Sequence, residues 1–136
     1  MRATGAFRVE SFNAVPLEIP GPEIATALPV GVATMEKRYE GDVAGRSTTI
    51  FTAAFDQSSG VGTYVAMESF EGALNGTAGT FNFAHAASTS GNDRTHEHFL
   101  ILPSSGTGDL ASISGFGGMA VDADDTHRVW FDYELE

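Results

Sequence analysis

The sequence predicts an all-β fold that closes into an eight-stranded antiparallel barrel. Gly, Ser, Thr and Asn interrupt the chain about every ten residues, and the runs between them are rich in Phe, Val, Thr and Tyr with alternating polarity. This pattern is typical of strands joined by turns, and helical periodicity is hard to find anywhere. Successive strands with short connections must hide their edges, and closure into a barrel does so completely. A sandwich of two sheets is the alternative.

The alternating runs place the strands in order along the chain. They predict eight strands, at residues 4–12, 30–40, 46–55, 61–72, 77–87, 94–103, 110–119 and 126–135. Residues 15–29, "VPLEIPGPEIATALP", contain four prolines, so we expect a long loop there with at most one short turn of helix. A chain of 136 residues is large enough for one core and short for two, so residues 1–136 are predicted to form a single domain.

The composition excludes several classes of function. The chain has 18 Asp and Glu residues against 7 Lys and Arg residues, a formal net charge of −11, which would repel the phosphates of a nucleic-acid partner. Cysteine is absent, so disulfides, thiolate metal ligands and cysteine nucleophiles are excluded. The opening "MRATGAFRVE" lacks the apolar run of a signal peptide, and no later window resembles a membrane span. We expect a cytoplasmic protein with no membrane partner.

Asn75-Gly76 is the best-defined turn, because Asn and Gly tolerate the positive φ that a type I′ turn requires. A two-residue loop at this point fixes the register between the strands on either side of it. The directly opposed residues are then Leu74 and Thr77, Gly72 and Gly79, Phe70 and Phe81, Glu68 and Phe83, and Ala66 and His85.

Opposed residues share a face of the sheet, and a period of two carries that face along each strand. Four large rings on this face would form an unusually large apolar patch if they were solvated, so the face is predicted to line the barrel interior. We therefore interpret its aromatic residues as candidate binding residues: Tyr64, Phe70, Phe81 and Phe83.

Glu68 and His85 enter the interior on the same face, diagonal to each other at a spacing that long side chains can bridge. A buried carboxylate needs a partner or a raised pKa, and a nearby imidazole supplies that partner. Such a pair can transfer protons, so both are candidate catalytic residues. A buried ion pair or hydrogen bond with a structural role is the alternative. A bulge near the turn would shift the register by one residue and separate them.

Residues 95–99, "THEHF", hold two of the four histidines. In a strand the two histidines point to one side and Phe99 to the other. A two-residue turn before the strand would place His98 or His96 opposite His85, depending on its position, whereas a loop of three or five residues would reverse the faces. The sequence leaves both orientations open, and His98 is included among the candidate binding residues.

If both histidines face inward, they join Glu68 and His85 in a set of side chains that a transition metal would accept. The His-x-His spacing also resembles the metal motif of cupins. Cupins carry a glutamate about four residues after the second histidine, whereas this chain has Leu102 there. We therefore predict neither a metal site nor a cofactor.

Four segments together resemble one family. They are "YEGDVAGRS" (39–47), "YVAMESFEGALNGTAGTFNFAH" (64–85), "LPSSGTGDLASISGFGG" (102–118) and "FDYELE" (131–136). In this order, over nearly the whole chain, they resemble the bacterial domain of unknown function 3224, within the allene-oxide-cyclase-like barrel superfamily. The resemblance implies a closed eight-stranded antiparallel barrel of allene-oxide-cyclase-like or calycin-like type. It also implies a frequent partner subunit and a family without an established activity.

The resemblance also bears on the candidate site. Glu68 and His85 match positions where the family pattern has Glu and His, which implies that both are pocket residues. Phe99 stands where the family more often has a tryptophan, and if this residue faces the interior then His96 and His98 face out. Relatives at superfamily level include allene oxide cyclases and dirigent proteins, which steer the ring closure or coupling of apolar substrates inside the barrel.

These observations predict a barrel that binds an apolar small molecule. One function is that of a cofactor-free isomerase or cyclase with Glu68 and His85 as acid and base. The alternative is a noncatalytic carrier or sensor, or a structural domain with a packed interior. An interior cavity of about 300 Å3 or more near Glu68 would favour binding. The outward residues Ile50, Val65 and Met67 predict a homodimer.

Overall fold

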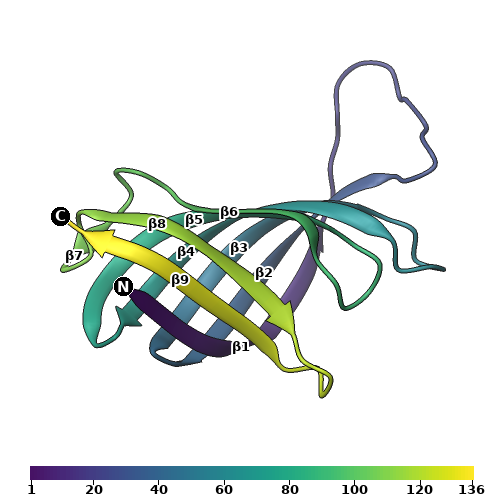
Figure 1. The fold of residues 1–136 in the computed structure, drawn as a ribbon. Helices are drawn as coiled ribbons and strands as arrows, with labels where there is room; N and C mark the ends of the chain where they lie inside the picture. Colours follow the sequence, from purple (N-terminus) through teal and green to yellow (C-terminus); the bar gives the residue numbers. More distant parts are fainter.

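The computed structural model, which describes residues 1–136, is a single sheet of nine antiparallel strands (Figure 1). The strands are β1 (Arg2–Val15), β2 (Val30–Gly41), β3 (Val43–Phe55), β4 (Gly62–Leu74), β5 (Thr77–Thr89), β6 (Thr95–Ile101), β7 (Thr107–Gly108), β8 (Ile113–Val121) and β9 (His127–Leu135). The predicted all-β class and the eight predicted strands are confirmed, with ends that differ by a few residues. The two-residue β7 is too short to show alternation and was missed.

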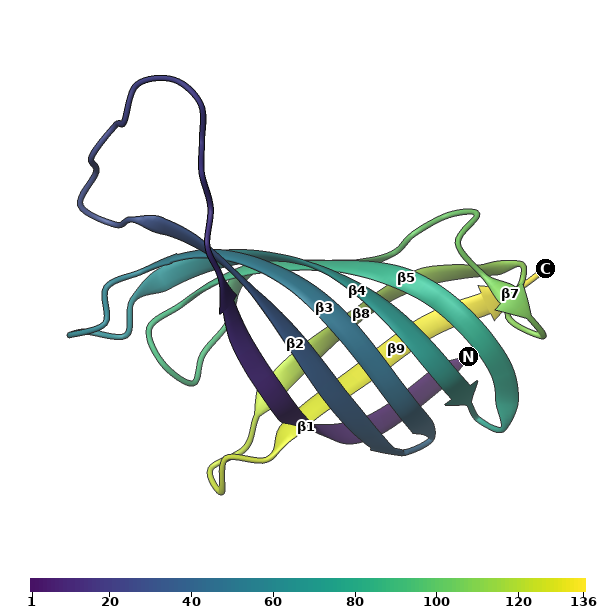
Figure 2. The same ribbon diagram turned by 180° about the vertical axis from the view of Figure 1, so that it is seen from behind.

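Eight of the strands are joined in a ring of hydrogen-bonded pairs. The order is β4-β3-β2-β1-β9-β8-β6-β5, β4 also pairs with β5, and β7 pairs with β5 alone. The link between β6 and β8 is the narrowest, with two register pairs. Residues 16–29 form the predicted loop without any helix, and the loop projects from one end of the ring (Figure 2). The structure contains no helix of sufficient length and apolarity to cross a membrane.

The register predicted from the Asn75-Gly76 turn is confirmed throughout β4 and β5. Both turn residues have positive φ, 50° and 81°, as a type I′ turn requires. The Asn75 amide also donates to the Arg2 carbonyl and to the Tyr133 hydroxyl, at 3.1 and 2.9 Å, and so ties the turn to β1 and β9. The turn sets the register between β4 and β5, so Glu68 and His85 share one face of the sheet. Both residues are buried, and this face points into the ring.

The interior is packed solid at the end of the ring that holds this turn, which we call the packed end. Leu110, from the segment after β7, is fully buried there. Phe131 lies among four other phenylalanine rings, with centroid distances of 5.2–6.5 Å. The core comprises Ala3, Tyr39, Val43, Phe70, Leu74, Phe81, Phe83, Phe99, Ile101, Leu110, Ile113, Val129, Phe131 and Tyr133.

The outer face carries exposed apolar residues in one register row. Ile50 lies directly opposite Met67, and the row continues through Ala84 and Leu100 to Phe116. Ile50, Met67 and Phe116 are 60, 45 and 64% exposed. Such a row is suited to contact with another protein surface.

The homodimer predicted for this face stays a prediction, and we expect a charge on it to prevent association. Met67→Glu adds a charge that an apolar interface could not pair. The wild-type chain is expected to sediment as a dimer at tens of micromolar and the variant as a monomer in analytical ultracentrifugation. The control is Ser69→Glu, two residues along the same outer face and outside the apolar row. A monomeric wild-type chain would contradict the prediction.

Candidate functional site

Glu68 stands at the centre of a buried polar cluster between β2, β3 and β4. Its residue exposure is 1%. One carboxylate oxygen accepts a hydrogen bond from Lys37 Nζ at 2.8 Å, and the other accepts from Ser47 Oγ at 2.5 Å and from the Tyr39 hydroxyl. Lys37 and Tyr39 are two residues apart on β2, so both point inward, and Ser47 on β3 lies opposite Lys37.

The three donors around Glu68 are largely shielded from water. Burial raises the pKa of Tyr39 well above its usual value, and the Glu68 carboxylate raises it further, so the phenol stays protonated and donates. The Lys37 side chain is 12% exposed, and its ammonium also lies 4.8 Å from the centre of the Phe7 ring. Both oxygens of Glu68 are therefore occupied by donors of the protein itself.

His85 belongs to a second polar cluster, on the β6 side of the ring. Its Nε2 lies 2.7 Å from the Glu97 carboxylate and 3.3 Å from the Tyr64 hydroxyl. Arg94 Nε donates to the same hydroxyl at 2.9 Å. Glu97 also accepts the backbone N–H of Met119 at 3.4 Å.

The imidazole of His85 is neutral at neutral pH. Burial lowers the pKa of His85 to about 3, and the charges of Lys37 and Arg94 contribute to the same shift. Burial raises the pKa of Glu97, and its carboxyl oxygen lies within hydrogen-bond distance of the His85 Nε2. The Nδ1 atom of His85 makes no hydrogen bond within the protein, so its lone pair is free.

The predicted contact between Glu68 and His85 is not formed. Both side chains point into the ring as expected, but no hydrogen bond joins them, and each has its own partners. Diagonal neighbours across a strand pair are about 7–8 Å apart. The Glu68 carboxylate bonds to the Lys37 ammonium, because an opposite charge stabilises a buried carboxylate more than a neutral imidazole does.

A pocket of about 260 Å3 opens at the other end of the ring, where β1, β3 and β5 end and β4 begins. We call this the open end. The His85 cluster reaches the pocket, because His85, Tyr64 and Arg94 line it, whereas Glu68 does not. The remaining lining residues are Phe7, Val9, Phe12, Met35, Lys37, Phe51, Phe55, Ala66, Thr89, Met119 and His127.

Comparison with known proteins fits this geometry. The model of the family described as "Protein of unknown function (DUF3224)" matches residues 3–133. The chain belongs to the DUF3224 family. A crystal structure of a DUF3224 protein of unknown function from Shewanella oneidensis MR-1 has the same fold, with a TM-score of 0.82 and 24% sequence identity. The alignment covers 100% of this chain and 98% of that one. No curated protein matches the chain.

Among the predicted binding residues of this DUF3224 protein, Tyr64 alone lines the pocket. Phe70, Phe81 and Phe83 are 1–2% exposed. Their rings belong to the core at the packed end, and their role as binding residues stays a prediction.

His98, another predicted binding residue, does not line the pocket either. It pairs with Ala86 on the outer face and is exposed, while Phe99 lies opposite His85 and is buried. Two features produce this arrangement: a five-residue connection, 90–94, and a bulge at which the backbone of His96 has a φ of 52°. His96 and His98 therefore face away from Glu68 and His85, as the family resemblance implied, and the four side chains considered for a metal do not meet.

Five residues of the two polar clusters in this DUF3224 chain were not predicted from the sequence: Lys37, Tyr39, Ser47, Glu97 and Arg94. Lys37 had a visible signal, because it is in phase with the inward Met35 and Tyr39 on a predicted strand. Glu97 depended on the orientation of β6, which the sequence left open. Arg94 was predicted as the first residue of the strand at 94–103, but it lies in the connection before β6.

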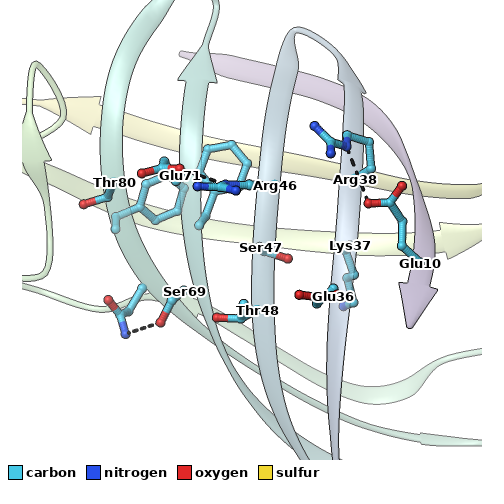
Figure 3. A pocket seen from close by; sticks show the side chains of 13 residues that line it. Glu10, Glu36, Lys37, Arg38, Arg46, Ser47, Thr48, Ser69, Glu71 and Thr80 are labelled. Atoms are coloured by element: carbon cyan, nitrogen blue, oxygen red, sulfur yellow. Dashed lines mark hydrogen bonds and ion pairs between the residues drawn. The ribbon is translucent and has the colours of Figure 1, made fainter. Parts of the chain in front are cut away.

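A wider hollow of about 600 Å3 lies over β1–β5 and is lined mainly by polar and charged side chains (Figure 3). Its polar side chains pair with one another: Arg46 with Glu71 at 2.9 Å and Asn82 with Ser69 at 3.3 Å. This hollow is open to solvent, so the interactions within these pairs are screened by water and salt. The pocket at the open end is therefore the better candidate for a functional site in this family member.

Proposed function

We propose that this DUF3224 protein binds a small, largely apolar molecule in the pocket at the open end of the ring. The supporting observation is the lining of the pocket: 9 of its 14 residues are hydrophobic, and a few polar groups converge on it. This combination is typical of small-molecule sites. A volume of about 260 Å3 is just below the usual range of about 300–1,000 Å3, which limits the ligand to about ten non-hydrogen atoms.

The ring of eight strands is consistent with this proposal. We treat it as a closed barrel of the allene-oxide-cyclase-like type, whose interior has room for side chains or for one small ligand. In this chain the phenylalanine core takes up the packed end, and the open end is left for the ligand. A purely structural role would not explain why apolar side chains line the pocket at the open end.

A cofactor-free isomerase or cyclase is the second candidate, and one observation favours it. His85 lines the pocket, is bonded to Glu97 at 2.7 Å and has a free Nδ1 lone pair. General acid–base catalysis is most efficient when the pKa of the group is near the working pH. A pKa of about 3 for His85 makes this imidazole a weak base at neutral pH, so noncatalytic binding is the better-supported function.

Loss of an apolar wall should weaken binding of a neutral apolar probe. Phe12 lines the pocket and is 59% exposed, so Phe12→Ala should disturb the fold little. We expect its Kd for 3-phenylpropan-1-ol, measured by NMR titration, to rise about fivefold to tenfold, because about 1–1.5 kcal/mol of apolar contact is lost. At about 0.4 kcal/mol per non-hydrogen atom, the wild-type Kd should be in the millimolar range.

Phe116→Ala is the matched control. Phe116 is 64% exposed on the outer face and does not line this pocket, so its loss should leave the Kd within about twofold. A wild-type protein that shows no saturable binding of the probe, or equal effects of the two substitutions, would refute the proposed site.

A further inference from the structure

The charges around the pocket differ from those of the whole chain. The protein has 18 acidic and 7 basic residues, yet no Asp or Glu lines the pocket, while Lys37 and Arg94 both do. Two of the 4 histidines, His85 and His127, line it as well. In this acidic protein the pocket at the open end is therefore lined by cations and by no carboxylate.

Arg94 is the one Lys or Arg residue without a carboxylate partner. The other six basic side chains each lie within 4.0 Å of an Asp or Glu oxygen, including Lys37, whose charge is balanced by Glu68 at 2.8 Å. Arg94 instead donates from Nε to Tyr64 and from Nη1 to Thr89 Oγ1 and to the carbonyls of Gly91 and Asp93. Its Nη2 donates to nothing in the protein.

Glu97 is not that missing partner, because its carboxylate is bonded to His85 and to the backbone of Met119 and lies beyond ion-pair distance of Arg94. The Arg94 side chain is partly buried and held in place by its four hydrogen bonds. A guanidinium that is fixed at an apolar wall is suited to a carboxylate, which accepts hydrogen bonds from its planar fork. A single cation without an ion-pair partner favours a monoanion over a doubly charged phosphate ester.

We infer that the ligand of the pocket carries a carboxylate on an apolar body, and that Arg94 is its counter-ion. The inference rests on the proposed function, since it names the class of molecule that the same pocket binds. The apolar body lies against residues such as Phe12 and Phe51, and the carboxylate accepts from the free Nη2 of Arg94.

The test compares two probes that differ in one group, 3-phenylpropanoate and 3-phenylpropan-1-ol, by NMR titration at neutral pH and low salt. The wild-type protein is expected to bind the carboxylate about tenfold more tightly than the alcohol, because a charge-assisted hydrogen bond is about twice as strong as a neutral one. Arg94→Gln should reduce that preference to about one.

Arg46→Gln is the control variant, because it removes the same charge from an exposed pair on the outer face, and it should keep the tenfold preference. The Arg94 Nε–H resonance of the wild-type protein gives a readout that needs no variant: it should shift with the carboxylate and not with the alcohol. Equal binding of the two probes, a preference that survives Arg94→Gln, or an unmoved Arg94 resonance would overturn the inference alone. Absence of binding by both probes would overturn the proposed function and this inference with it.

Discussion

Replacing Phe131 with alanine is expected to lower the free energy of unfolding by about 3–5 kcal/mol, the range known for buried phenylalanine in well-packed cores. Phe131 is 0% exposed. Its ring packs against those of Phe70, Phe81, Phe83 and Phe99. These rings come from β4, β5 and β6 and that of Phe131 from β9, so the cavity would open at the point where distant strands meet. The neighbouring aromatic side chains are held in place by the surrounding strands, so they cannot move far enough to fill the cavity.

Urea denaturation of the wild-type and variant proteins would measure this loss. Phe116→Ala is the control, because that ring is 64% exposed on the neighbouring strand β8, and it should change the free energy of unfolding by less than about 0.5 kcal/mol. Similar losses in the two variants would mean that the packed end is not the main source of stability.

The parts of this fold that are predictable from the sequence are those that short-range rules determine. The Asn75-Gly76 turn has one favoured geometry, and once it is placed, a period of two assigns every side chain of β4 and β5 to a face. The amino-acid sequence alone therefore places Glu68 and His85 inside the ring. The proline-rich loop at 16–29 is predictable for the same reason.

The site itself depends on long-range and irregular features. The partner of Glu68 is Lys37, 31 residues away in sequence and two strands away in the sheet, and the turn rules say nothing about it. The orientation of β6 depends on a bulge at His96, and a shift of one residue reverses every side chain of a strand. The sequence also does not show how far the interior is filled, which is why Phe70 and its neighbours in the core were predicted as binding residues.

Glu68→Gln is expected to cost about 3–5 kcal/mol of unfolding free energy, because it leaves a buried cation without its partner. Lys37 is 12% exposed and can regain little hydration, and the amide of the glutamine has one oxygen where the carboxylate had two acceptors for Lys37, Tyr39 and Ser47. Urea denaturation is again the measurement. Glu71→Gln is the matched control on the same strand, because Glu71 and its ion-pair partner Arg46 are both exposed to solvent. This substitution should lower the free energy of unfolding by about 1 kcal/mol or less.

A second variant separates the ion pair from the rest of the cluster. Glu68→Leu combined with Lys37→Met replaces both charges by apolar groups, which in buried pairs is often neutral or stabilising. We expect the double variant to recover most of the stability that Glu68→Gln loses, apart from the bonds to Tyr39 and Ser47. If the double variant also binds 3-phenylpropan-1-ol with the wild-type Kd, Glu68 has a structural role and the chemistry of the pocket belongs to His85 and Arg94, which line it. A loss of binding would instead place the Lys37–Glu68 pair in the function of the site, since Lys37 lines the pocket.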